Sequence, residues 1–127
     1  MALQVTTIML AVEDMERSKK FYVALGAKLA QDFPNFASFD LDGGSALGIY
    51  PTAHAAKDAG VSPEGTGFRG VSFHHIVATP EEVDEVITTA LDAGGAIVKP
   101  AASAGWGGYF AYLADPDGHL WKIAASA

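Results

Sequence analysis

A strand, a helix and three short β-rich segments occur twice in the same order along this chain, and this repeat constrains its fold more than any other feature. The segment after the first predicted helix, GAKL (26–29), is matched by GAIV (95–98) after the second. The period is longer than that of solenoid repeats. We therefore expect an α+β single domain (1–127) with two tandem βαβββ modules, at residues 4–50 and 71–124.

In the first half of the chain, side chains recur with the spacing of a strand and then with that of a helix. Side chains alternate between apolar faces over residues 5–12, which predicts a strand. Asp14 is the predicted N-cap of a helix that ends near Gly26. The three β-rich segments after this helix are 27–31, 35–41 and 45–50, with the Asp42-Gly43-Gly44 turn before the last.

The second half repeats this order after a linker. Residues 51–70 are rich in Gly, Pro and Ala and form the predicted linker, with a short helix around 53–59. Thr79-Pro80-Glu81-Glu82 is a predicted capping box with proline at the first helical position. The predicted strands are 74–78 before this helix and 96–99, 109–114 and 120–124 after it.

Strand alternation divides each module's part of the sheet into a face under the helix and an opposite, concave face. In the first strand, Thr7 and Met9 belong to the concave face if Ile8 and its alternate neighbours pack under the helix. In the last strand the same alternation places Lys122 on the concave face. Apolar pockets with a few polar groups are the usual small-molecule sites. We therefore expect a curved mixed sheet with a ligand-binding cavity.

Three segments carry a resemblance to a known family. They are AVEDMERSKKFYVALG (11–26), HHIVATPEEVDEVITTALDAGG (74–95) and GWGGYFAYLADPDGHLWKIA (105–124). The chain resembles the vicinal oxygen chelate superfamily, which includes glyoxalases, extradiol dioxygenases and bleomycin resistance proteins. The resemblance implies paired βαβββ modules, usually arranged as a dimer, with a cavity that holds a divalent metal in the catalytic branches.

The resemblance also implies four metal-ligand positions, and the chain places one ligand there. The aligned residues are, in order, Thr7, Leu47 or Gly48, His75 and Lys122. A protonated lysine has no lone pair to donate, and its charge repels a divalent cation. A catalytic zinc site takes about three protein ligands. We therefore expect no cofactor and no chelated divalent metal.

The candidate site residues line the expected cavity. His75 and Lys122 are the candidate catalytic residues, for metal-free acid–base chemistry. The expected ligand-binding residues are Thr7, Met9, Leu47, His75, Trp106, Tyr109 and Lys122. The alternatives are that His75 is satisfied by a neighbour or water, that Lys122 extends to the cavity mouth, and that the aromatic residues are core.

Two pairs of acidic residues have structural interpretations. The segment DPDG fits a type I turn with Pro116 at its second position, so Asp115 and Asp117 are predicted turn formers. Glu81 and Glu82 lie at a predicted helix N-terminus, where negative charge is favourable.

Composition and charge exclude several partners. The net charge is −7 and the 8 basic residues are spread along the chain, so we expect neither nucleic acid nor a membrane as partner. The chain has no cysteine, so cytoplasmic localisation is the default expectation. The apolar start MALQVTTIMLAV lacks a basic segment and a cleavage site, so we interpret it as a strand.

These observations favour a homodimeric protein of this superfamily that binds a small-molecule ligand without a chelated metal. The acidic surface suits a cationic ligand. One alternative is a lyase, isomerase or dioxygenase acting on a carbonyl or aromatic compound, either metal-free through His75 and Lys122 or with an atypical metal site. Another is a module that only dimerises or docks with a protein.

Overall fold

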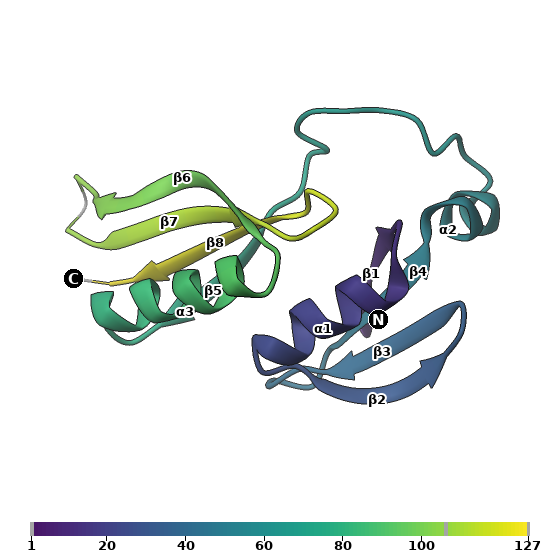
Figure 1. The fold of residues 1–127 in the computed structure, drawn as a ribbon, viewed down its shortest axis with the longest axis horizontal. Coiled ribbons are helices and arrows are strands. Elements are labelled where there is room, and N and C mark those ends of the chain that lie inside the picture. Colours follow the sequence, from purple (N-terminus) through teal and green to yellow (C-terminus); the bar gives the residue numbers. More distant parts are fainter. Residues whose placement is uncertain (1, 106, 127) are drawn as a thin grey trace. The chain divides into compact units, whose positions relative to one another are not determined.

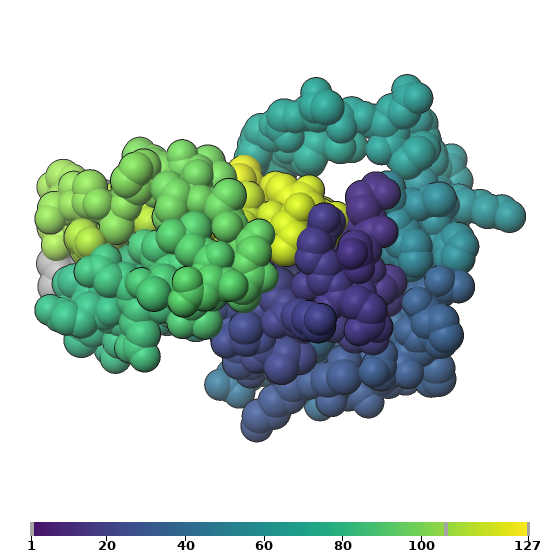
Figure 2. Space-filling view, viewed as in Figure 1, coloured from purple at the N-terminus to yellow at the C-terminus, as the bar shows by residue number. Residues whose placement is uncertain are grey.

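The structure of this chain is a computed structural model that describes residues 2–105 and 107–126. It divides into two compact units, Met1–Thr66 and Gly67–Ala127. The first runs from purple to teal and the second from teal through green to yellow in Figures 1 and 2. Each unit holds one four-stranded mixed sheet with a helix against one of its faces. That both units act as one domain stays a prediction.

The first unit has the predicted βαβββ order followed by one additional helix. Its elements are β1 (Thr7–Val12), α1 (Met15–Ala24), β2 (Lys28–Phe33), β3 (Phe36–Asp40), β4 (Ala46–Pro51) and α2 (Thr52–Ala59). The strand order is β1-β4-β3-β2, in which β1 and β4 are parallel and the other pairs antiparallel.

The second unit repeats this arrangement. Its elements are β5 (Phe73–Val77), α3 (Pro80–Asp92), β6 (Ala96–Ser103), β7 (Tyr109–Ala114) and β8 (Leu120–Ala125). The strand order is β5-β8-β7-β6, again with the first and last strands of the unit parallel. The predicted α+β fold with two βαβββ modules is confirmed.

Strand β6 is longer than the sequence predicts. The predicted strand covers 96–99, whereas β6 runs on to Ser103 through Pro100, which has no N–H to donate to a sheet. In the structure β6 is an edge strand, and its pairing with β7 shifts register between Lys99 and Ala102, which accommodates Pro100. Such shifts bend and twist a strand.

The core of the first unit lies between α1 and the sheet. Phe21 and Tyr22 are 0% and 2% exposed, and the Tyr22 ring lies 6.0 Å from that of Phe39. Leu10 and Val12 are buried on the same side of β1, whereas Met9 is 43% exposed. The predicted division of β1 into a buried and an open face is therefore confirmed.

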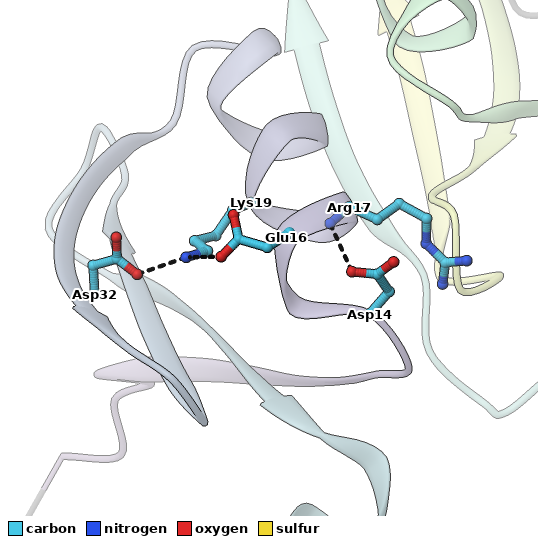
Figure 3. A network of polar contacts seen from close by, with 5 residues as sticks. All are labelled: Asp14, Glu16, Arg17, Lys19 and Asp32. Carbon is cyan, nitrogen blue, oxygen red and sulfur yellow. Dashed lines mark hydrogen bonds and ion pairs between the residues drawn. The ribbon is translucent and has the colours of Figure 1, made fainter.

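A short polar network holds α1 in place (Figure 3). Asp14 caps the helix, because its carboxylate accepts the backbone N–H of Arg17 at 3.0 Å. Lys19 Nζ lies 2.7 Å from a carboxylate oxygen of Asp32 on β2 and 2.7 Å from one of Glu16. These hydrogen bonds, to Asp32 first and then to Glu16, raise the pKa of Lys19. The helix is thus tied to the far edge strand of its sheet.

In the second unit the predicted helix start is present with one difference. Thr79 Oγ accepts the backbone N–H of Glu82 at 3.2 Å. The Glu82 carboxylate accepts the N–H of Ala78, not that of Thr79 as in a capping box. The helix α3 then buries Val83 and Ala90.

The DPDG segment forms the predicted turn between β7 and β8. The Asp115 carbonyl accepts the N–H of Gly118 at 3.0 Å. The buried Asp115 carboxylate accepts the N–H groups of Asp117 and His119 at 2.9 and 2.8 Å. Asp115 is therefore a turn former, as the sequence indicates.

The helices are short. Within residues 2–105 and 107–126, none is long and apolar enough to cross a membrane.

Candidate functional site

The most chemically distinctive surface of the second unit is the sheet face opposite α3. We call it the cationic face and define it by five residues of four adjacent strands: His74 of β5, Lys99 of β6, Phe110 and Tyr112 of β7, and Lys122 of β8. The strand register brings them together, because Tyr112 pairs with Lys99 on one side and with Lys122 on the other. Lys122 in turn pairs with His74. Laterally paired residues share one face of a sheet.

Both ammonium groups of the cationic face lie against aromatic rings. Lys122 Nζ is 4.6 Å from the centroid of the Phe110 ring and 5.9 Å from that of Tyr112. Lys99 Nζ is 5.1 Å from the Phe110 centroid. The two rings meet edge to face, with centroids 6.1 Å apart. These are cation–π distances, so the rings support the lysine side chains over the sheet.

The two adjacent histidines of β5 lie on opposite faces. His75 pairs with Ile123, which is 2% exposed on the face under α3. His74 pairs with Lys122, and its Nε2 lies 3.2 Å from Ser72 Oγ. The structure therefore brings His74 onto the face of Lys122, where the motif alignment had placed His75. Neighbouring residues of a strand lie on opposite faces. An alignment that is wrong by one position therefore assigns a side chain to the wrong face.

Tyr109, a predicted ligand-binding residue, is not on the cationic face. Tyr109 lies on the α3 side, where its hydroxyl donates to Asp84 Oδ1 at 2.7 Å. This hydrogen bond, together with burial and the negative charges of Asp84 and Glu81, raises the pKa of Tyr109. Trp106 lies outside the described residues. Phe110 and Tyr112 form the aromatic surface of the cationic face instead.

The first unit presents a different open face opposite α1. Thr7 and Met9 lie on it, but Leu47 is 1% exposed on the side under the helix, so it cannot contact a ligand there. Its neighbour Gly48 occupies the open face and pairs with Met9. A Cβ at Gly48 would lie 2.8 Å from Met9 Cε, so the Met9 side chain covers this glycine. The Met9 side chain gives this face an apolar part, and the row of Thr7 continues through Ala46 to Asp40 and Lys28.

Of the five residues of the cationic face, only Lys122 is among the predicted site residues. Phe110 could have been found, because it lies two positions before Tyr112 and alternation places both on one face. Lys99 could not, because the register of β6 shifts on either side of it, between Ile97 and Lys99 and between Lys99 and Ala102. Simple alternation fails across such bulges.

The donor set of this chain does not fit the divalent metal that the resemblance implies. Leu47 offers no donor atom, and the Lys122 ammonium is a cation that rests on aromatic rings. Over the described ranges 2–105 and 107–126, no three His, Cys, Asp or Glu side chains are grouped so that they could hold a metal ion.

Two βαβββ units, each with one helix-covered and one open sheet face, define a paired-module α+β protein. The chain belongs to the Glyoxalase/Bleomycin resistance protein/Dioxygenase superfamily, whose family model matches residues 4–123.

Solved structures agree with this membership. A glyoxalase-related enzyme from Fulvimarina pelagi is 29% identical, with a TM-score of 0.89 over 98% of this chain and 89% of that one. A hypothetical protein, SA1046, from S. aureus is 28% identical, with a TM-score of 0.85 over 98% and 94% of the two chains. No curated protein matches the chain.

Proposed function

We propose that this protein binds a small organic molecule on an open sheet face without a chelated metal. The observation that carries the proposal is the position of Lys122. The resemblance implies a carboxylate ligand there, and this chain has an ammonium group 4.6 Å from the centre of the Phe110 ring. A cation at this place repels a divalent ion and favours organic groups that accept hydrogen bonds or stack on the rings.

The open faces also have the composition of a ligand site. Small-molecule sites are mostly apolar and aromatic, with a few polar groups that fix the ligand's orientation. The cationic face combines two rings with three nitrogen-bearing side chains. The open face of the first unit, taken by itself, carries Met9 and the edge-to-face rings of Phe36 and Tyr50, whose centroids are 6.2 Å apart.

We also propose that the protein is a cytoplasmic homodimer. A chain of 127 residues has a small core, so association would stabilise it. Light scattering should give a mass twice the 13.2 kDa of one chain. A mass of one chain at all concentrations would contradict the dimer.

Elemental analysis tests the absence of a chelated metal. The protein is purified without a metal-affinity column, incubated with equimolar zinc or nickel, and freed of loose ions by gel filtration. We expect substoichiometric metal both before and after incubation. One tightly held divalent ion per chain would overturn the proposal.

Ligand binding is tested separately by thermal unfolding against a panel of small organic molecules. A ligand that binds only the folded state raises the midpoint temperature in a saturable way. Chromatography of the same samples shows whether the molecule is consumed. Recovery of the unchanged ligand supports binding, and conversion to a product supports the second candidate.

That second candidate is an enzyme acting on a carbonyl or aromatic compound. It is favoured by the similarity to the Fulvimarina pelagi protein, whose description is a glyoxalase-related enzyme. Its metal-free form needs a base beside Lys122. We propose His74 for this role, because His74 pairs with Lys122 in the strand register. If turnover of a discovered substrate survives in both His74→Ala and Lys122→Met proteins, this form fails.

A further inference from the structure

We infer that the cationic face binds an organic anion, specifically a carboxylate joined to an apolar ring. The inference rests on the proposed binding function and names the class of its ligand. It also reverses the expectation, from net charge alone, that a cation would be preferred.

The first observation is that charge is segregated across the sheet of the second unit. Helix α3, which covers one face of this sheet, carries the acidic residues Glu81, Glu82, Asp84, Glu85 and Asp92. On the opposite face, Lys99 and Lys122 occupy paired positions beside His74. Among the paired strand positions of this face that the structure describes, none is acidic. A chain with net charge −7 thus has a locally positive surface.

The second observation is the geometry of the two lysines. They come from strands on either side of β7, and both extend to the same Phe110 ring, at 4.6 and 5.1 Å from its centroid. A ring attracts an ammonium through its quadrupole but carries no counter-charge. An ammonium group has three N–H donors, and a carboxylate oxygen is a good acceptor for them. A carboxylate here would receive charge-assisted hydrogen bonds.

The aromatic residues determine the rest of the ligand. Phe110 and Tyr112 present an apolar surface directly beside the ammonium groups. A planar apolar body can stack on it or meet it edge to face while its carboxylate reaches a lysine. A cationic ligand in the same place would be repelled by two positive charges. The face therefore selects for a ring with an acidic group.

The test compares three probes with the same carbon skeleton and different charge: benzoate, benzyl alcohol and benzylammonium. Each is titrated into the ¹⁵N-labelled full chain at constant ionic strength, and amide shifts are followed. We expect benzoate to shift the amides of β7 and β8 around Phe110, Tyr112 and Lys122 in a saturable way. The alcohol should bind about tenfold more weakly, because it lacks the charge-assisted bonds, and benzylammonium should bind least.

Variants locate the site. Lys99→Met and Lys122→Met each should weaken benzoate binding by about tenfold, the effect of losing one charge-assisted hydrogen bond. Lys122→Arg keeps the charge and should retain binding, which separates loss of charge from misfolding. Lys57→Met is the matched control, because it removes one positive charge from α2 in the first unit.

Three outcomes overturn the inference. Equal affinity for benzoate and benzyl alcohol would show that charge has no role, while leaving the proposed binding function intact. The inference also fails if no probe shifts these amides. Benzoate binding that is unaffected in both Lys→Met proteins would place the anion elsewhere. A chelated metal found by elemental analysis would overturn the proposed function, without altering how this titration is interpreted.

Discussion

At the scale of single residues, the face on which a side chain lies decides what it can do. Leu47 and Gly48 are neighbours on β4, yet Leu47 is 1% exposed under α1 and Gly48 lies beneath Met9 on the open face. His74 and His75 differ in the same way on β5. One position along a strand therefore separates a core residue from a candidate ligand contact.

The contact between Gly48 and Met9 gives a prediction for stability. An alanine in a strand is favoured over glycine by about 0.5–1 kcal/mol. A Cβ at Gly48 would lie 2.8 Å from Met9 Cε, so the Met9 side chain must move, which offsets the gain. We expect Gly48→Ala to be nearly neutral in urea unfolding.

The matched experiment is a double-mutant cycle with Met9→Ala. In that background the obstructing atoms are absent, so Gly48→Ala should stabilise the protein by about 0.5–1 kcal/mol. Equal effects of Gly48→Ala in both backgrounds would show that Met9 does not cover this glycine.

At the scale of elements, each unit depends on how its helix is fixed to its sheet. The helix α1 is tied to β2 through Lys19 and Asp32. The helix α3 is tied to β7 through Asp84 and Tyr109. The two contacts join a helix to a strand of its sheet, across 13 and 25 residues of sequence, so they stabilise the packed unit rather than the isolated helix.

The start of α3 gives a prediction for helix capping. The N–H of Glu82, in the first turn of α3, donates to Thr79 Oγ at 3.2 Å and to the Thr79 carbonyl at 3.1 Å. Thr79→Ala should lower the free energy of unfolding by about 1 kcal/mol, as for other N-caps. Thr79→Ser keeps the hydroxyl and should retain most of the stability in the same urea titration. Equal losses in both variants would show that the methyl group, and not the hydrogen bond, matters.

The hydrogen bond between Tyr109 and Asp84 predicts a dependence of stability on pH. The folded chain raises the pKa of Tyr109 above its ordinary value of 10.0. Between the ordinary pKa and the raised pKa of the folded state, the folded chain binds more protons than the unfolded chain. The free energy of unfolding therefore falls as pH rises. Below pH 10 the contribution of Tyr109 is fully present, and it is lost as pH passes the folded pKa.

Tyr109→Phe removes this titration and should make the fall in stability above pH 10.0 shallower. The pKa of Lys19 is also raised, from an ordinary value of 10.5, so Lys19 too lowers the free energy of unfolding at alkaline pH. This contribution is the same in both proteins. Urea unfolding at a series of alkaline pH values measures the difference. Identical slopes for the two proteins would contradict the assignment.

At the scale of the whole molecule, the connection between the two units is the distinctive feature. Residues 60–72 form neither helix nor strand, and residues 60–71 are all exposed (Figure 1). Exposed segments without secondary structure are the preferred sites of proteolysis. The short helix α2 occupies the first part of the predicted linker 51–70. The connection without secondary structure therefore begins only at residue 60.

Brief digestion with trypsin should therefore cut first after Arg69, which is exposed in this connection. Mass spectrometry should find fragments 1–69 and 70–127. Arg69→Gln should remove this early cut, and cleavage at the other sites should stay slow. A first cut at Lys19 or Lys20, within α1, would show that the helix opens more readily than the connection.

The sequence by itself determined the two βαβββ modules, the helix starts at Asp14 and Thr79, the turn at Asp115 and the buried side of β1. These features depend on residues close together in the chain, through alternation, helical spacing and capping. Only the tertiary structure decided which strands pair and in what register. That pairing places His74 beside Lys122, Lys99 across from it, and Leu47 in the core. The physical reason is that register is fixed by contacts between distant segments and by bulges, and a one-residue shift exchanges the faces of a strand.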